Sequence, residues 1–282
     1  MSASRQGLSL AIAILVAAVS SSGCTSFKIR VLMKEGNRLY TAQKYEEAIK
    51  RYDQILKIDP TSWDANYLGA VSYLALYHPG SDHPKDREYA EKGLAAFERT
   101  LGLKPPSGEA RAKTEKYYLS FLDSSGDNAK AVAYLEKQLE SRPNDLALIL
   151  QIAALYHKKG DYLKALEYYE RRATMDPKNK EAWYTLGVNC WDRSYHGGSM
   201  VSQQEREQVV ERGIDAFEKA LAIDPVYFDA LSYINLIYRE KAKALAAVGK
   251  NAEAGQAYAK ADEFQKRAID VRKAQVAKQK VG

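Results

Sequence analysis

The sequence predicts an all-α fold, a solenoid of about six helix-turn-helix repeats followed by a capping helix. Five similar segments each close at a proline: Pro60, Pro105, Pro143, Pro177 and Pro225. In each segment a small residue stands four positions before a bulky one, which places both on one helical face. These pairs are Ala48 and Tyr52, Gly93 and Phe97, Ala131 and Leu135, Ala165 and Tyr169, and Gly213 and Phe217. The proline then ends the helix, so the pattern predicts closely packed helix pairs.

The first and fourth repeats fit a 34-residue unit in register. Gly36 and Ala48 take its eighth and twentieth positions, and a longer set of matches follows in the fourth repeat and the start of the fifth: Ala153, Tyr156, Gly160, Ala165, Tyr169, Pro177, Trp183, Leu186 and Gly187. In these residues the chain resembles the tetratricopeptide-repeat family. The resemblance implies a right-handed superhelix that binds other proteins, with no catalysis and no cofactor.

The N-terminal residues 1–23 are typical of an export signal, with Arg5 followed by the apolar run Leu8 to Val19. This run is shorter than the roughly 20 residues of a spanning helix. Gly23-Cys24 resembles the lipobox of bacterial lipoproteins, although Ser21 stands where that family usually has Leu. The resemblance implies acylation of Cys24. Thr25 in place of aspartate favours the outer membrane, facing the periplasm, over inner-membrane anchoring or secretion.

The charge balance excludes little except nucleic-acid binding. Without Arg5 the chain has 41 basic and 36 acidic residues, and the two signs alternate along the helices, as on solvated helix faces. If Cys24 is acylated, Cys190 has no partner for an intramolecular disulfide. Its place near the apolar register predicts a small core residue rather than a nucleophile.

After a linker at residues 24–28, the solenoid is expected to fill residues 29–282 as one domain. The predicted repeats cover residues 29–62, 63–107, 108–145, 146–179, 180–227 and 228–262. The second and fifth carry about 11 and 14 residues beyond the family unit. Both insertions are predicted as loops, Tyr77 to Ser81 and Tyr195 to Ser199, which share the pattern Tyr-His-x-Gly-Ser 118 positions apart. This indicates a duplicated block of three repeats.

The C-terminal segment predicts a long closing helix over Asn251 to Gln279. Phe264, Ala268 and Val271 form its predicted inward stripe, and its basic residues are expected to face outward: Lys266, Arg267, Arg272, Lys273, Lys278 and Lys280. A polar outer face suits the end of a repeat stack. The alternative is a basic helix that touches an anionic lipid or polymer.

Motifs for common enzyme classes are missing from the sequence, which has no HExxH, GxxxxGK[ST] or GxSxG. One group, His78, Asp82, His83 and Asp86, has spacing that could hold a divalent ion, but a polar turn explains it equally well. We therefore predict no metal site, and keep a metal-dependent enzyme as a lesser alternative.

By resemblance, the binding groove is lined by positions 2, 5, 9, 12 and 13 of the first helix of each repeat, which we call the groove register. The candidate groove residues are Asn37, Tyr40, Tyr73, His157, Tyr184, Trp191 and Arg239, and the candidate loop contacts are His78 and His196. Met33 stands where the chaperone-binding clamp of some relatives needs lysine, so that clamp is not expected. An aromatic and polar groove suits an extended peptide or a helix.

The sequence thus predicts a membrane-anchored periplasmic scaffold or assembly adaptor whose partners are envelope proteins or peptides. A module that binds the cell wall or an anionic polymer is the alternative. The sequence leaves the oligomeric state and the partner's identity open.

Overall fold

The computed structural model describes residues 25–279 of the chain; residues 1–24, with the predicted signal segment and Cys24, and residues 280–282, with Lys280, lie outside the described residues. Every regular element among the described residues is helical, so the predicted all-α class is confirmed. The sequence predicts one repeat array, and this stays a prediction. The described residues form two compact units, residues 25–127 and residues 128–279, with the division inside the third predicted repeat.

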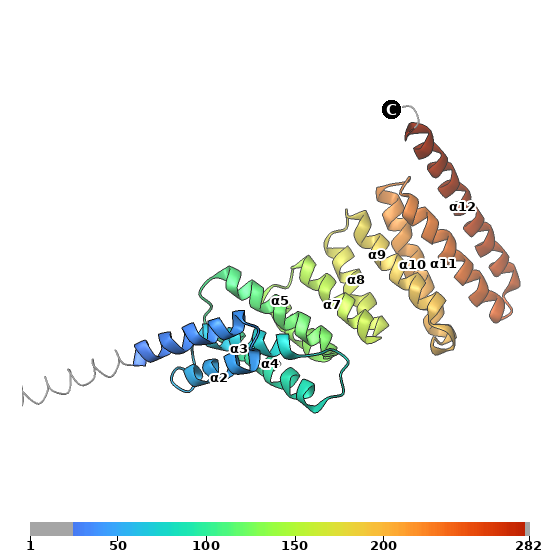
Figure 1. The fold of residues 1–282 in the computed structure, drawn as a ribbon. Coiled ribbons are helices and arrows are strands. Elements are labelled where there is room, and N and C mark those ends of the chain that lie inside the picture. Colours follow the sequence, from blue (N-terminus) through green and yellow to red (C-terminus); the bar gives the residue numbers. More distant parts are fainter. Residues whose placement is uncertain (1–24, 280–282) are drawn as a thin grey trace, which may run out of the picture. The chain divides into compact units, whose positions relative to one another are not determined.

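Unit 1, residues 25–127, holds five described helices. They are a helix over residues 25–41, α2 (Tyr45–Leu56), α3 (Trp63–Leu76), α4 (Pro84–Gly102) and α5 (Gly108–Ser124) (Figure 1). Pro84 opens α4, where a missing N–H does no harm, and the Ser107 hydroxyl caps α5 by accepting the N–H of Ala110. Helices α2, α3, α4 and α5 each pack on the next, which makes the unit a stack of antiparallel helices.

Unit 2, residues 128–279, continues the same alternation. Its elements are α6 (Asn128–Ser141), α7 (Leu146–Lys159), α8 (Tyr162–Met175), α9 (Lys180–His196), the short 3₁₀ helix η1 (Gly198–Met200), α10 (Gln203–Ile223), α11 (Phe228–Ala247) and α12 (Asn251–Gln279). Asp145, Asp161, Asn179 and Ser202 cap α7, α8, α9 and α10 through their side-chain oxygens. Figure 1 shows α7 to α12 following one another as neighbouring helices.

Small residues let the paired helices approach, as the sequence predicts. A Cβ atom placed on Gly36 would lie 2.6 Å from the Tyr52 ring, and one placed on Gly187 would lie 2.6 Å from the Phe217 ring. Tyr52 and Phe217 are fully buried. The glycines at these two positions are therefore required for the helix contact.

The two predicted insertions are only partly loops. Helices α4 and α10 have 19 and 21 residues, whereas α8 in the regular fourth repeat has 14. Longer helices thus take up much of the extra length, and the remaining connections are residues 77–83 and residues 197–202. The second connection contains η1.

The last helix, α12, is one continuous helix of 29 residues. Phe264 and Ala268 are buried and Val271 is half-buried, on the stripe that the sequence predicts. None of the helices within residues 25–279 combines the length and apolar character needed to cross a membrane.

Candidate binding groove

A hollow of about 300 Å³ in unit 1 collects side chains from the first helices of three successive predicted repeats. Tyr40 comes from the helix over residues 25–41, and the other lining residues come from α3 and α5: Tyr67, Leu68, Val71, Leu74, Ala75, Lys113 and Tyr117. We call this the tyrosine hollow. Aliphatic side chains form its walls, and three phenol groups with one ammonium group supply its polar atoms. A mostly apolar concavity with a few polar groups is the usual form of a binding site.

Burial keeps two phenols of the tyrosine hollow, those of Tyr67 and Tyr40, neutral. Desolvation raises the pKa of Tyr67 to about 12, and the neighbouring Tyr117 and Tyr40 add to the effect. Desolvation also raises the pKa of Tyr40. Both hydroxyls therefore remain hydrogen-bond donors at any physiological pH. The Lys113 ammonium lies 6.0 Å from the centroid of the Tyr117 ring, and the Trp63 ring stacks on Tyr67 at 4.9 Å.

In unit 2, rings from α9, from α11 and from the residue just before α11 form a second feature, which we call the aromatic row: Tyr227, Tyr184, Tyr233, Trp191 and Tyr195. Successive ring centroids lie 5.3, 5.8, 5.2 and 5.2 Å apart along this order. Spacings of this size are typical of favourable aromatic pairs. Tyr195 is 52% exposed, whereas the other members are half-buried, so only one end of the row is open to solvent.

The predicted groove residues are divided between these two features and the helix contacts. Tyr40 lies in the tyrosine hollow, and Tyr184 and Trp191 lie in the aromatic row. Asn37 instead accepts a hydrogen bond of 3.1 Å from the Tyr52 hydroxyl, which joins its helix to α2. Arg239 donates to Asp262 at 2.8 Å and to Gln265 at 2.9 Å, so its guanidinium group fastens α11 to α12.

His157 on α7 lies close to α9. Its Nε2 atom is 3.9 Å from the Asp192 carboxylate, and its ring meets the Tyr162 ring at 5.2 Å. The same carboxylate bonds the Nδ1 atom of His196 at 2.9 Å. His157 of α7 and His196 of α9 therefore share the carboxylate of Asp192. Their imidazole rings could contact a partner at this point.

Two sequence-based assignments need correction, those of Tyr73 and His196, whereas His78 lies in a loop as predicted. Tyr73 lies away from the tyrosine hollow, because its ring faces Tyr89 on α4 at 6.3 Å and lines a different recess beside α2. His196 is not in a loop, since α9 extends through it and its ring meets Trp191 edge-on at 5.7 Å. His78 is in a loop, but its backbone N–H and ring bind Asp86, at 3.1 and 3.0 Å, within the same connection.

Sequence reasoning missed Tyr67, Tyr117 and Tyr233. The groove register used for the other repeats, extended to the second repeat, selects Tyr67, Val71, Leu74 and Ala75, all of which line the tyrosine hollow. In α5 the lining residues Lys113 and Tyr117 fall one position later than that register, so the same rule would have missed them. Tyr233 lies outside the groove register. Its role depends on contacts with the Tyr184 and Trp191 rings of α9, which only the structure shows.

The residues considered for chemistry are otherwise engaged. His83 caps α4 through a ring nitrogen, and no three His, Cys, Asp or Glu side chains within residues 25–279 are grouped to hold a metal ion. Cys190 is fully buried, and desolvation raises the pKa of its thiol to about 12, so the thiolate needed of a nucleophile is not formed near neutral pH.

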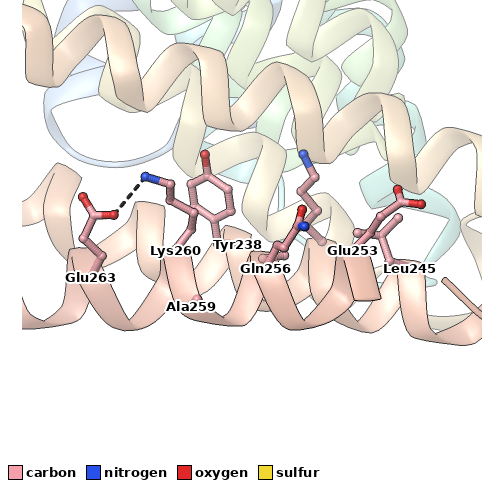
Figure 2. Close-up of a pocket in the computed structure, with 9 residues that line it drawn as sticks. Tyr238, Leu245, Glu253, Gln256, Ala259, Lys260 and Glu263 are labelled. Carbon is pink, nitrogen blue, oxygen red and sulfur yellow. Dashed lines mark hydrogen bonds and ion pairs between the residues drawn. The ribbon is translucent and has the colours of Figure 1, made fainter. Parts of the chain in front are cut away.

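A larger recess of about 600 Å³ lies between α11 and α12 (Figure 2). Tyr238, Lys241 and Leu245 line it from α11, and Glu253, Gln256, Lys260 and Glu263 line it from α12. Figure 2 shows Lys260 directed toward Glu263, with which it forms an ion pair of 2.9 Å. Charges of both signs that pair within the recess indicate a solvated surface rather than a preformed site.

Comparison with known proteins identifies the repeat. Residues 147–181 and residues 119–145 each match the tetratricopeptide repeat. Photosystem I assembly protein Ycf3 from Sorghum bicolor is 30% identical over 144 residues, which cover 47% of this chain and 81% of that protein. The same protein from Acaryochloris marina is 26% identical over 147 residues, covering 50% of this chain and 88% of its own length.

Two other relatives match over a small part of their length. The chain spans 6% of the general transcriptional corepressor trfA from Dictyostelium discoideum, at 34% identity over 88 residues, and 19% of anaphase-promoting complex subunit 3 from Schizosaccharomyces pombe, at 26% over 140 residues. Among solved structures, Naa15/Naa10 bound to HypK-THB is 18% identical, with a TM-score of 0.51 over 85% of this chain and 33% of that one. This likeness supports the helical-repeat fold alone.

Proposed function

The chain belongs to the tetratricopeptide-repeat family, and from that premise we propose that it is an interaction scaffold or assembly adaptor that holds envelope proteins or peptides without catalysis of its own. Repeats of this kind mediate contacts between proteins. The relatives from Sorghum bicolor and Acaryochloris marina are named as assembly proteins, which agrees with such a role.

The tyrosine hollow is the observation that carries this proposal. A volume of about 300 Å³ suits one or two side chains rather than a whole cofactor. Leu68, Val71 and Leu74 offer an apolar surface to such a side chain, while the Tyr67 hydroxyl and the Lys113 ammonium group can bind acceptors beside it. We therefore propose that unit 1 anchors one bulky apolar residue of an extended partner segment that carries carbonyl or carboxylate oxygens next to that residue.

Membrane attachment is the second part of the proposal. Gly23-Cys24 after an apolar run supports acylation of Cys24, and two acyl chains are enough for stable anchoring. We propose an outer-membrane lipoprotein that faces the periplasm, with inner-membrane anchoring and secretion as alternatives.

A lysine substitution inside the tyrosine hollow tests whether the hollow binds a partner. Crosslinking in intact cells followed by affinity purification would first identify the main bound protein. Leu74→Lys places an ammonium group inside the tyrosine hollow and should lower co-purification by more than about tenfold, because a central anchor contributes about 2 kcal/mol or more. The matched control is Leu163→Lys, since Leu163 is 48% exposed on α8.

Circular dichroism checks that both variants remain helical. Lys113→Glu is a second variant at an exposed residue, where misfolding is not expected, and it should weaken a partner that brings carboxylate oxygens. Unchanged co-purification in both Leu74→Lys and Lys113→Glu would contradict the groove assignment.

A further inference from the structure

The helix over residues 25–41 carries an exposed stripe on the side away from the core of unit 1. Phe27, Val31, Lys34 and Arg38 recur at intervals of four, three and four residues, which places them on one face. Phe27 is 70% exposed and Val31 is 48% exposed. The opposite face carries Gly36 and Leu39, which are buried against α2.

The stripe has a single sign of charge. Arg30 flanks it, and none of the described residues forms an ion pair with Arg30, Lys34 or Arg38. The one acid in this stretch, Glu35, lies to the side of the stripe and pairs with Arg51 of α2 at 3.1 Å. Along the helix, therefore, the apolar residues lie at the end nearer Cys24 in the sequence, and the cations follow them.

We propose that this stripe binds the surface of a bilayer that contains anionic phospholipids. Phe27 and Val31 enter the interface, while Arg30, Lys34 and Arg38 contact lipid phosphates. Amphipathic helices with basic residues beside an aromatic one bind membranes in this manner, through buried apolar area and attraction to anionic headgroups.

The inference rests on the proposed anchoring at Cys24. Phe27 is three residues beyond Cys24, and a fully extended chain covers at most about 3.6 Å per residue, so an acyl anchor would hold Phe27 within about 11 Å of the lipid. A second copy of the chain is a poorer occupant, because pairing two stripes would bring the same cations together.

The test places a fluorescent reporter on the stripe of the full chain. Phe27→Trp adds one indole at an exposed site, and the unsubstituted protein, with Trp63, Trp183 and Trp191, is the matched control. Brominated lipids quench indoles at short range. In vesicles of brominated phosphatidylcholine with phosphatidylglycerol, the fluorescence gained by Phe27→Trp should fall by more than half, while that of the control stays unchanged.

Three comparisons decide the outcome. In the Cys24→Ser background, where no acyl chain holds position 27 near the lipid, adding Arg30→Glu, Lys34→Glu and Arg38→Glu to Phe27→Trp should abolish the quenching. Unquenched Phe27→Trp in anionic vesicles would overturn the proposal, as would equal quenching of the Cys24→Ser form of Phe27→Trp in vesicles of brominated phosphatidylcholine alone. So would a concentration-dependent dimer without vesicles that dissociates on Phe27→Asp, because the stripe would then bind a second copy.

Flotation of the full chain and of Cys24→Ser with neutral vesicles tests the anchoring itself. Equal flotation of the two would refute the acyl anchor, whatever the reporter shows. Failure of the anchor and failure of the stripe are therefore distinguishable.

Discussion

The connections at residues 77–83 and 197–202 lie at the same place in their repeats, yet groups of opposite charge hold them. The first contains a whole Tyr-His-x-Gly-Ser segment, and the second contains the last three residues of such a segment, whose Tyr195 and His196 end α9. In the first, the buried carboxylate of Asp86 accepts the His78 N–H at 3.1 Å and the Ser81 hydroxyl at 2.6 Å. In the second, the Arg206 guanidinium group donates to the carbonyls of Ser194 and Gly198. We call the Asp86 contacts the first clamp and the Arg206 contacts the second clamp. At the offset of 118 residues, Asp86 corresponds to Gln204 and Arg206 to Glu88, so neither clamp has a counterpart in the other copy.

The two tyrosines of the shared segment also differ. Tyr77 packs on Phe121 at 5.3 Å and donates its hydroxyl to the Ser124 carbonyl, whereas Tyr195 stacks on Trp191 and is 52% exposed. The Tyr-His-x-Gly-Ser segment therefore does not determine its own conformation. The charged residue in the first turns of the following helix determines which groups of the connection are bound.

The largest expected effect concerns a glycine contact that the second and fifth repeats share. Gly93 and Gly213 lie in the middle of α4 and α10, and a Cβ on either would lie 2.8 Å from a neighbouring side-chain Cβ, of Tyr73 or of Cys190. We expect Gly93→Leu and Gly213→Leu each to lower the free energy of unfolding by about 3 kcal/mol or more, through overpacking. Urea denaturation measures it.

The control for this pair is Gly255→Leu in α12, where nothing lies within 4 Å of an added Cβ. It should not destabilise the protein, since leucine favours a helix more than glycine does. If Gly213→Leu behaved like Gly255→Leu while Gly93→Leu did not, the two repeats would differ in their helix contacts as well as in their connections.

A smaller effect is expected from the second clamp alone. Arg206→Gln removes the donors to the Ser194 and Gly198 carbonyls and should cost about 1–3 kcal/mol, because Ser194 is buried and its carbonyl loses a partner. Hydrogen exchange should speed up at the amides of residues 197–202 and remain unchanged at residues 77–83. Arg87→Gln, at an exposed position of α4, serves as the control and should stay within about 0.5 kcal/mol of the unsubstituted protein.

The smallest expected effect is on the pH dependence of stability, which should differ between the two clamps. Hydrogen bonds from Ser81 and then from His78 lower the pKa of Asp86 from 3.8 to about 2. Because the folded pKa lies below the unfolded one, the contribution of Asp86 to stability is complete above pH 4 or so and is lost as the pH falls toward 2. The stability difference between the unsubstituted protein and Asp86→Asn should therefore shrink across that range.

The loss of stability caused by Arg206→Gln should stay the same over this pH range, because a guanidinium group remains protonated there. Thermal melts of both variants at several pH values make the comparison. A constant difference for Asp86→Asn would show that its carboxylate does not hold the first connection.

Residues at helix contacts were predictable from the sequence, because a repeat requires small and bulky side chains at fixed spacing. Gly36 against Tyr52 and Gly187 against Phe217 follow that rule. The charged clamps were not predictable, since Asp86 and Arg206 act on atoms of a connection whose path the spacing does not determine.

The candidate site was predicted less well for a related reason. Tyr40, Tyr184 and Trp191 follow the groove register, but Tyr73 lies six residues after Tyr67, which turns it to another side of α3. Arg239 has the right register and yet is bound by α12. Only the structure shows which cation a neighbouring helix already holds.

The last two turns of α12 depend on the packed turns that precede them in the same continuous helix. From Arg272 to Gln279 every residue is exposed, so these two turns have little packing of their own. An isolated helix this short would not form in water, because the first turn is costly to nucleate. Ala254, Ala261 and Phe264 pack the preceding turns and so provide the nucleus, from which each further residue adds one backbone hydrogen bond. The length of α12 is therefore set by a propagation equilibrium, and the helix shortens on warming from its exposed C-terminal turns while the packed half stays helical.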